Sequence, residues 1–492
     1  DPATPGPATR TRSSTNNETK FHSMFVRDAS VQGEPAGMGT EYEILQLLRM
    51  HERDETDPAD DAGRLYQILR VAAPLRRDPH FEYADQVPIP KTMREACHPS
   101  NRHHKKWIEA RDTEINAFIT NEVIGMIAPV SEVKKAGHKI LTTMTVMTVK
   151  PDEMGGIKKM KVRVVAKGCS SIPGLHYDES ALFAPTAKGA SIKIILSIAA
   201  VRNLNLISVD ISCAFLSAKL DIPQWIYRPD GFEKLIPPGY AALLVASVYG
   251  LKSSPALFNG ELDEHLRVRC GFSVTKSDPC FYWKKDPRTG AETYVCVVVD
   301  DMIIAYSHSV DGFLSTLQKK YRITGGEELT RILGMEVKRD RRARKLWLTQ
   351  SEYIGRMLRR YGMDGDDVKT CDTPSASDAK FSVAMCGDLG LDPKTNKNPL
   401  RQMMGSLLFA AICTRPDIAY EVSVLSRYVS SPGKGHLKGT RRMFRYLKKF
   451  PNTGLCLGGH SLIDHHWSDA DYGGDCATPE DSHKSRSSWQ SY

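Results

Sequence analysis

The sequence predicts an α+β fold, because segments with a two-residue apolar alternation are interleaved with segments of helical spacing. The strand-like segments are rich in Val, Ile and Thr, which favour strands, and Gly or Asn residues separate several of them. The expected elements, in order, are helix 105–119, strand 139–150, turn 153–157, strand 158–168, helix 191–203, strand 204–210, helix 260–272, hairpin 294–306 and helix 309–321. This order predicts a sheet covered by helices.

Length and composition divide the chain into four parts. The 492 residues are 41% hydrophobic and 25% charged, with a net charge of +9, which is compatible with a nucleic-acid partner. The 11 scattered cysteines indicate reduced thiols inside a cell. Residues 1–100 are expected to be a mostly disordered linker with short helices at 41–50 and 64–73. An α+β body over 101–345, a helical basic region over 346–460 and the beginning of another domain over 461–492 are expected to follow.

The stretch YVCVVVDDMIIAY, residues 294–306, places Asp300 and Asp301 inside an apolar run. Adjacent buried carboxylates repel each other, so they need a solvated turn, a basic partner or a metal ion. Asp210 ends the strand of ISVDISCAFL. If these strands share one sheet, three carboxylates meet at one rim, where two Mg²⁺ ions, with Mn²⁺ as a substitute, would neutralise them. The alternative is a solvated hairpin tip.

Ten further segments carry a resemblance that extends over residues 105–492. They are KVRVVAKG (161–168), YDESALFAPTA (177–187), SVDISCAFLSAKL (208–220), IYRPDGF (226–232), VYGLKSSPALF (248–258), VVVDDMII (297–304), ILGMEV (332–337), TRPDIAY (414–420), RYLKK (445–449) and WSDADYGGD (467–475). In this order they resemble the reverse transcriptase region of copia-type LTR retrotransposon polyproteins, running into the start of the ribonuclease H domain.

The resemblance implies a right-hand polymerase with fingers and a ferredoxin-like palm over 101–345 and a thumb and connection over 346–460. It implies RNA-directed DNA polymerase activity, by nucleotidyl transfer from a dNTP to a primer 3′-hydroxyl on an RNA or DNA template. The family's catalytic, metal-binding aspartates correspond to Asp210, Asp300 and Asp301, with Asp301 more auxiliary. Asp469 corresponds to the first metal ligand of ribonuclease H, an activity that we do not expect from residues 461–492.

The same resemblance assigns substrate contacts, each with a structural alternative. Phe215 would pack under the sugar and exclude a 2′-hydroxyl; the alternative is a core residue. Lys161, Arg163 and Lys167 would meet the triphosphate, since Lys161 and Arg163 share one strand face; the alternative is a solvated strand. Ser253 stands where a glutamine helps to place the template–nucleotide pair.

Basic runs suggest contacts with the nucleic-acid backbone. Arg341, Arg342, Arg344 and Lys345 form the first candidate track, and residues 441–449 form a second. The alternative in both cases is an ordinary basic surface. Expected partners are therefore an RNA template, a DNA primer–template, dNTPs and the integrase and capsid pieces of the same polyprotein, but no membrane. The family implies an intracellular location, in virus-like particles and the nucleus.

Several positions depart from the family pattern. Val298 replaces the usual tyrosine, Ser253 replaces glutamine, and Ala181 with Leu182 disturbs the spacing of the second motif. A degenerate copy that has lost catalysis and keeps only nucleic-acid binding is therefore the alternative reading. Because the chain begins with Asp1 rather than Met, we also expect it to be a piece of a longer protein.

Overall fold

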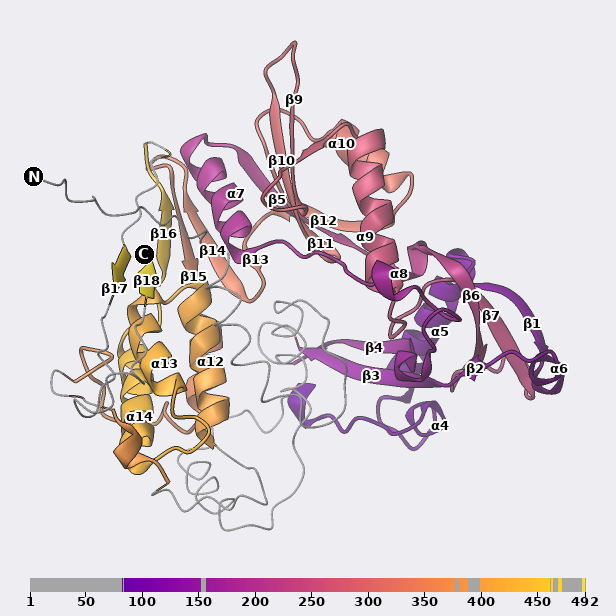
Figure 1. Ribbon diagram of the computed structural model, residues 1–492, viewed down its shortest axis with the longest axis horizontal. Coiled ribbons are helices and arrows are strands. Elements are labelled where there is room, and N and C mark those ends of the chain that lie inside the picture. Colours follow the sequence, from indigo (N-terminus) through magenta and orange to yellow (C-terminus); the bar gives the residue numbers. More distant parts are fainter. Residues whose placement is uncertain are drawn as a thin grey trace, which may run out of the picture.

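The computed structural model describes residues 82, 84–151, 156–376, 379, 381–387, 399–460, 462, 468–470 and 489–491 (Figure 1). Most of the expected linker, with its helices at 41–50 and 64–73, and most of the expected turn at 153–157 lie outside these residues. The described elements alternate between helices and strands, so the predicted α+β fold is confirmed.

The N-terminal part of the fold contains a four-stranded sheet and a separate two-stranded ribbon. The sheet has the order β1-β7-β6-β2, and β3 pairs with β4 in antiparallel fashion. The elements are η1 (Ala84–Gln86), α4 (Met93–Ala96), α5 (His104–Thr120), β1 (Ile124–Pro129), α6 (Val130–Lys135), β2 (Ile140–Leu141), β3 (Thr143–Pro151), β4 (Ile157–Ala166), β6 (Lys219–Tyr227) and β7 (Tyr240–Ala246). This part corresponds to the expected fingers.

One face of the β3–β4 ribbon is held against α5. Met147, Met160 and Val162 are buried in one apolar cluster with Trp107 of α5, which is fully buried. Met93 and Ala96 belong to the same cluster, so the folded body begins before the expected boundary at residue 101. Because side chains alternate along a strand, this packing leaves the residues between the buried ones on the opposite face.

A six-stranded antiparallel sheet forms the centre of the molecule and corresponds to the expected palm. Its order is β12-β5-β11-β10-β9-β8, and α7, α9 and α10 share its apolar core. The elements are η2 (Gly168–Ser170), η3 (Glu179–Ala181), α7 (Gly189–Val201), β5 (Asn205–Ile211), α8 (Ala214–Ser217), α9 (Ser254–Glu264), the π-helical η4 (His265–Arg269), β8 (Ser273–Val274), β9 (Phe281–Lys285), β10 (Glu292–Val298), β11 (Asp301–Tyr306), α10 (Asp311–Gln318) and β12 (Ile323–Glu328).

The helix α7 is fixed at both ends by side chains from distant parts of the chain. At its N-terminus the buried Asp278 accepts hydrogen bonds from the Lys188 backbone N–H at 2.8 Å and from the Ser191 hydroxyl at 2.5 Å. At its C-terminus Arg344 donates to the Val201 carbonyl at 2.8 Å and Arg339 donates to the Ala199 carbonyl at 2.8 Å. A carboxylate at the N-terminus and cations at the C-terminus both complement the helix dipole.

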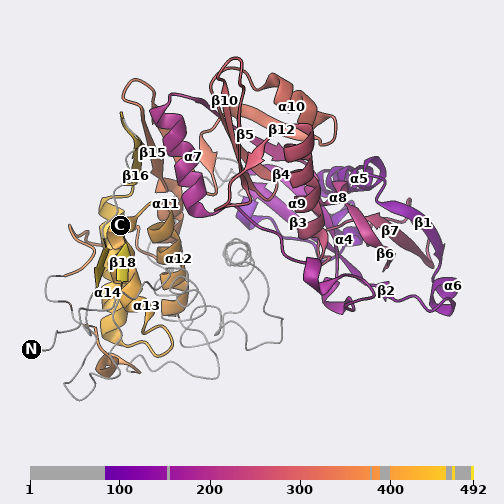
Figure 2. The same ribbon diagram turned by 45° about the horizontal axis from the view of Figure 1, so that its top comes forward.

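The C-terminal part combines a second sheet with a helical bundle. The sheet order is β13-β14-β15-β16, and its β15 and β16 contact α7 (Figure 2). The elements are β13 (Arg331–Ile332), β14 (Met335–Asp340), β15 (Lys345–Thr349), α11 (Ser351–Arg360), η5 (Val383–Met385), α12 (Pro399–Cys413), η6 (Pro416–Ile418), α13 (Ala419–Ser426), α14 (Lys434–Lys449), β16 (Leu455–Gly458), β17 (Ser468–Ala470) and β18 (Trp489–Ser491).

One sequence expectation for this part was wrong. The helical region was expected to begin at residue 346, but residues 345–349 form strand β15. Leu346 and Leu348 are buried with Trp347 half-buried between them, so the period is two rather than 3.6. The strand is also paired on both sides, with β14 and β16.

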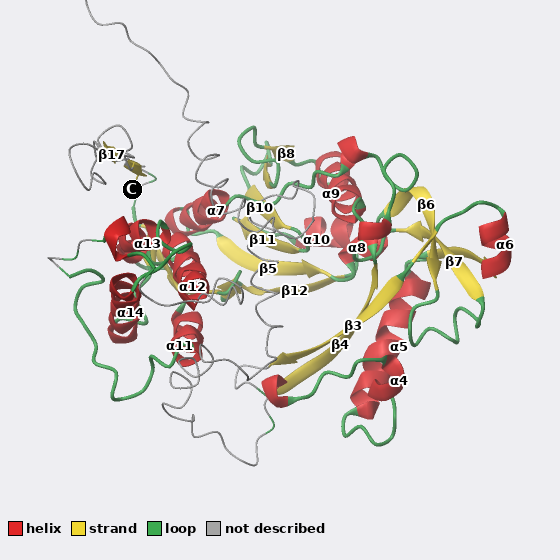
Figure 3. Ribbon diagram, turned by 60° about the horizontal axis from the view of Figure 1, so that its bottom comes forward, coloured by secondary structure: helices red, strands yellow, loops and turns green. Residues whose placement is uncertain are grey.

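The central sheet separates the two flanking parts. Figure 3 shows the helices α11–α14 on one side of the sheet and α5 with the β3–β4 ribbon on the other. None of the helices within the described residues is both long enough and apolar enough to span a bilayer.

Candidate active site

The three predicted aspartates meet at one end of β5 and β11. The register places Asp301 directly opposite Asp210, and the Ile211 N–H donates to the Asp300 carbonyl at 2.8 Å. Val298 pairs with Asp301, so Val299 and Asp300 form a two-residue hairpin turn. All three aspartates are half-buried. The predicted hairpin is therefore confirmed, with its carboxylates against a strand that carries a third.

The turn carries backbone strain at Val299. Its φ of 59° lies in the left-handed region, which a β-branched residue rarely adopts. The antiparallel ladders on both sides of β11 hold this geometry in place. Strained residues of this kind persist only where the surrounding structure over-determines them. The turn thus holds Asp300 at a fixed position beside β5.

Burial and a neighbouring negative charge both act on Asp210. Burial raises the pKa of its carboxyl group, and the charge of Asp300 raises it further. The Thr324 hydroxyl, which donates to Asp210 Oδ2 at 3.3 Å, and the charges of Lys161 and Lys150 oppose this increase in the pKa. The site therefore concentrates negative charge that the protein only partly compensates.

The chemistry of these donors fits a hard divalent cation. Within the described residues, no three His, Cys, Asp or Glu side chains are grouped closely enough to hold a metal ion by themselves. Mg²⁺ usually takes one or two protein carboxylates and completes its shell with water and substrate phosphate. Asp210 and Asp300, whose mutual repulsion a cation would relieve, match this requirement.

Lys161 and Arg163 lie on the free face of β4. The residues between and after them, Val162 and Val164, are buried on the opposite face, as the alternation predicted. Burial and the charge of Arg163 lower the pKa of Lys161, whereas Asp210 acts in the opposite direction. Lys161 of the ribbon and Asp210 of the central sheet are thus electrostatically coupled.

Lys167, in contrast, lies beyond the end of β4 and is exposed. Its backbone N–H donates to the Thr142 carbonyl at 2.8 Å. Lys167 therefore lies beyond the strand face on which Lys161 and Arg163 form a cationic surface.

Phe215 and Ser253 lie in the segments that follow β5 and precede α9. Phe215 is half-buried in α8 and meets the rings of Tyr249 and Phe258 edge-on, at centroid distances of 5.2 and 6.1 Å. Ser253 is the half-buried N-cap residue of α9, and its hydroxyl makes no capping hydrogen bond. Phe215 therefore packs against the core and is only partly buried.

The first basic track lies at the opposite end of β5 from Asp210. Arg341 donates to Asn205, the first residue of β5, at 3.3 Å and pairs with Glu328 at 3.5 Å. Arg344 donates to the carbonyl that ends α7, whereas Arg342 and Lys345 are exposed. Five residues of extended strand separate Asn205 from Asp210, or about 17 Å. Two of the four cations thus have a structural role.

The second basic track is also engaged by the protein. Lys448 of α14 donates to the carbonyls of Gly365 and Val368 at 2.7 and 3.0 Å, and Arg442 donates to the Thr373 hydroxyl at 2.8 Å. Lys449 pairs with Asp372. These cations hold the loop that follows α11 against α14.

Asp469 lies on β17, where it pairs with Gln490 of β18. The intervening residues 471–488 are outside the described residues, so the ribonuclease H assignment stays a prediction.

Two residues that the sequence reasoning missed support the cationic face. Glu114 of α5 is buried, and its Oε1 accepts a hydrogen bond from the Val164 N–H of β4 at 2.9 Å. Tyr249 lies beneath Arg163, whose Cζ is 5.4 Å from the centre of the tyrosine ring. Both contacts join residues at least 50 positions apart, so no local pattern could have indicated them.

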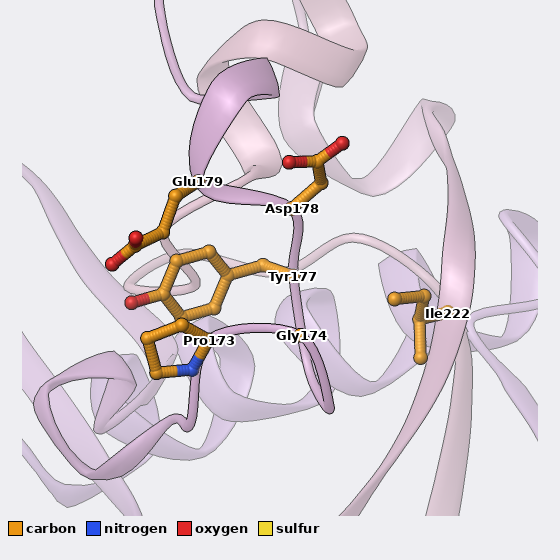
Figure 4. A pocket seen from close by; sticks show the side chains of 6 residues that line it. All are labelled: Pro173, Gly174, Tyr177, Asp178, Glu179 and Ile222. Atoms are coloured by element: carbon orange, nitrogen blue, oxygen red, sulfur yellow. The ribbon is translucent and has the colours of Figure 1, made fainter.

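An open hollow occurs elsewhere on the surface, next to the motif at 177–187 (Figure 4). Its lining residues are Pro173, Gly174, Tyr177, Asp178, Glu179 and Ile222. The Lys252 ammonium donates to the Tyr177 hydroxyl at 3.0 Å and lies 4.9 Å from its ring centre. None of the three aspartates lines this hollow, so the concave surface does not mark the carboxylate site.

Comparison with known proteins places this geometry in a family. The profile of the family described as reverse transcriptase (RNA-dependent DNA polymerase) matches residues 130–377, which include all the predicted site residues except Asp469 and the second basic track at 441–449. A retrovirus-related Pol polyprotein from transposon TNT 1-94 of Nicotiana tabacum is 32% identical over 408 residues, covering 81% of this chain and 30% of that protein. The corresponding polyprotein from transposon RE1 of Arabidopsis thaliana is 33% identical over 374 residues, covering 75% of this chain and 24% of that protein.

This chain therefore spans about a quarter to a third of the length of these relatives. A solved foamy viral protease–reverse transcriptase in complex with double-stranded DNA covers 85% of this chain and 62% of its own, at 13% identity and a TM-score of 0.33, too low to support an argument. The family profile and the polyprotein relatives together show that this chain belongs to the reverse transcriptase (RNA-dependent DNA polymerase) family, as a reverse transcriptase region of the copia type.

Proposed function

We propose that this chain is an RNA-directed DNA polymerase that transfers a nucleotide from a dNTP to a primer 3′-hydroxyl, using two Mg²⁺ ions at Asp210, Asp300 and Asp301. The observation that carries the proposal is the position of the strained Val299–Asp300 turn, which brings a second carboxylate against the half-buried Asp210. A site that concentrates like charges in this way is suited to cation binding.

Asp210 and Asp300 would hold the cations, with Asp301 in an auxiliary position opposite Asp210. When bound, two Mg²⁺ ions would lower the pKa of the primer hydroxyl and neutralise charge on the leaving pyrophosphate. The fixed turn and the paired β5 would keep the carboxylate oxygens in place, so that little reorganisation is needed during the reaction.

Lys161 and Arg163 would bind the triphosphate from the ribbon side. Arg163 Nε is buried and has no hydrogen-bond partner within the described residues, which leaves a costly unpaired donor that an anion would satisfy. Lys161 is close enough to Asp210 for each charge to affect the pKa of the other group, so the cationic face and the carboxylates border one space. Phe215 is only partly buried, and a deoxyribose could pack on its ring.

Two departures from the family pattern support the alternative of a degenerate copy. Val298 is buried and cannot supply the aromatic ring that the family places there, and the side chain of Ser253 is shorter than a glutamine. Neither residue replaces a carboxylate, which is why polymerisation remains the function that we propose. The other polyprotein pieces, a nucleic-acid template and dNTPs are the partners this function requires.

The test is extension of oligo(dT) on poly(rA) by the purified chain with Mg²⁺. Asp300→Asn should lower the rate by at least about 100-fold, the scale observed when one preorganised charge-stabilising group is removed. Asp221→Asn is the matched control, because Asp221 is exposed on β6. Extension should also stop with a chelator and return with Mg²⁺ or Mn²⁺.

A well-folded chain that binds the primer–template but extends nothing would overturn the polymerase proposal and support the degenerate copy. Equal extension by the wild type and Asp300→Asn would instead show that the activity comes from another site or a contaminant.

A further inference from the structure

Tyr249 contacts two residues that the proposed function assigns to different parts of the incoming nucleotide. The guanidinium carbon of Arg163 lies 5.4 Å from the centre of its ring. The Phe215 ring meets the same ring edge-on, with centroids 5.2 Å apart and an interplanar angle of 77°. One half-buried aromatic ring therefore lies between the candidate triphosphate-binding cation and the candidate sugar-facing residue.

The backbone around Tyr249 is hydrogen-bonded to both neighbouring segments. The Ala166 N–H at the end of β4 donates to the Tyr249 carbonyl at 2.8 Å. The Ser247 N–H donates to the Ala218 carbonyl at 2.8 Å, and the Ser247 hydroxyl donates to the Phe215 carbonyl. Residues 247–249 thus join the end of the β4 strand to the α8 segment.

A close backbone approach fixes this junction. Gly250 has a φ of 88°, and a Cβ atom added to it would lie only 2.1 Å from the Ala166 carbonyl oxygen. Only glycine allows the two backbones to approach this closely. The ring of Tyr249 therefore projects from a segment whose position relative to β4 is set by the backbone itself.

An aromatic ring suits a cation that must also bind an anion. The face of the ring attracts the guanidinium group, and the Tyr249 hydroxyl forms a hydrogen bond with the Arg163 side chain. Burial raises the pKa of Tyr249 to about 12, so the phenol stays neutral at physiological pH and does not compete as an anion. A guanidinium group carries five N–H donors, so the hydrogen bond to Tyr249 leaves other donors of Arg163 for phosphate oxygens.

We propose that Tyr249 is a positioning residue that holds Arg163 and Phe215 together, and so couples triphosphate affinity to discrimination against a ribose 2′-hydroxyl. The inference rests on the proposed polymerase function. The contact with Phe215 is made by the ring alone, whereas Arg163 is held by both the ring and the phenolic hydroxyl. Sugar discrimination should therefore depend on the ring, and triphosphate affinity on the ring and the hydroxyl together.

The experiment compares Tyr249→Leu, Tyr249→Phe and the wild type. Tyr249→Leu should raise the KM for dTTP by about tenfold, the effect of losing a desolvated cation–π contact, and should lower the preference for dTTP over UTP several-fold. Tyr249→Phe should retain the preference for dTTP over UTP and should raise the KM for dTTP less than Tyr249→Leu does, because only the hydrogen bond to Arg163 is lost. Tyr240→Leu is the matched control, since Tyr240 is a half-buried tyrosine at the start of β7 in the same sheet as β6.

A double-mutant cycle separates positioning from general destabilisation. If Tyr249 acts through Phe215, the loss of sugar discrimination in Phe215→Val should not increase further in the Phe215→Val, Tyr249→Leu variant. Additive losses, or a Tyr249→Phe variant as defective as Tyr249→Leu, would overturn the inference. So would a Tyr249→Leu variant with unchanged KM and unchanged preference.

A second measurement does not require nucleotide transfer, and it distinguishes failure of this inference from failure of the proposed function. It measures capture of dTTP by the chain on a primer ended with a dideoxynucleotide. Capture that is weakened more in Tyr249→Leu than in Tyr249→Phe supports the positioning role even if the wild type extends nothing. If the wild type captures dTTP and Tyr249→Leu captures it equally well, only this inference is overturned. If the wild type neither captures nor extends, both this inference and the proposed function are overturned.

Discussion

Replacing Asp210 by Asn should stabilise the metal-free protein while abolishing polymerisation. Burial and the charge of Asp300 both raise the pKa of Asp210, which means that the ionised carboxylate destabilises the folded state. An amide of nearly the same shape removes the charge and keeps the volume. The Thr324 hydroxyl, 3.3 Å from Asp210 Oδ2, can still donate to the amide oxygen.

The size of the effect can be estimated from Coulomb's law. As an upper limit, two unit charges about 4 Å apart repel by roughly 4 kcal/mol at an effective dielectric constant of about 20. Because Asp210 is only half-buried, screening by solvent reduces this to about 1 kcal/mol. A gain of that size corresponds to an increase in Tm of about 2 °C in a chain of this length.

Thermal unfolding of the wild type and Asp210→Asn, first in a chelator and then in Mg²⁺, tests this reasoning. Asp210→Asn should unfold at the higher temperature in the chelator. In Mg²⁺ at about ten times its Kd the wild type should gain about 1.4 kcal/mol, and the order should reverse. Asp221→Asn should follow the wild type in both conditions.

The sign of the pH dependence provides a further check. A carboxyl group with a raised pKa carries its penalty fully above that pKa, and the penalty is absent below the ordinary value of about 4. The advantage of Asp210→Asn should therefore disappear as the pH falls from 7 to about 4. A variant less stable than the wild type in chelator at pH 7 would refute the account of charge repulsion at this site.

Three other predictions concern strain and buried charge. Val299→Gly should raise the free energy of unfolding by about 1 kcal/mol, because glycine adopts a φ of 59° without the steric cost that a side chain has in the left-handed region. An unchanged or lower free energy of unfolding would contradict the assigned strain. Arg415→Met should lower the free energy of unfolding, measured by chemical denaturation, by about 3–5 kcal/mol. The fully buried guanidinium donates to Asp417 at 2.7 Å and to the Phe450 carbonyl at 2.7 Å, and the substitution leaves both acceptors without a donor. A loss below about 1 kcal/mol would contradict this role. For Asp417, burial raises the pKa, but hydrogen bonds from Arg415 and Tyr446 outweigh burial and hold the pKa below its ordinary value. Its stabilisation is thus complete above pH about 4 and is lost as the pH falls through the lower folded value, so acid titration of Tm should be flatter in Asp417→Asn than in the wild type.

The periodic elements of the fold could be predicted from the sequence because their packing partners are regular. Helix α5, the β3–β4 ribbon, α7 and β5 each show one buried face and one clear period, and the aspartate hairpin is a continuous apolar run that is buried on both faces. The three aspartates followed from the same logic, since each ends or interrupts an apolar strand. Because their strands share one sheet, Asp301 lies opposite Asp210 and Asp300 lies in the adjoining turn, whereas their joint role at a metal site stays a prediction.

The parts that could not be predicted depend on contacts between distant residues. In 338–349 the density of cations indicated a surface track, but Arg344 adopts a φ of 52° and donates to the Val201 carbonyl, 143 residues away. Strand β15 was not recognised in the sequence for a related reason, because its alternating leucines directly follow the basic run. The position of Tyr249 beneath Arg163 likewise has no local signature.

The pairing of β15 with β16 has a consequence for how this chain can be built and altered. Leu348, one residue before the end of β15, pairs with Leu455, the first residue of β16, so the chain leaves this sheet and returns to it at one place. The bundle α11–α14 is therefore an insertion within what is otherwise a simple hairpin. A short turn could replace the whole insertion and leave the sheet register intact. The bundle has its own apolar core but also contacts α7, where Lys193 donates to the Ile412 carbonyl of α12 at 3.0 Å, so its replacement would remove this contact and need not change the register of the strands that carry the aspartates.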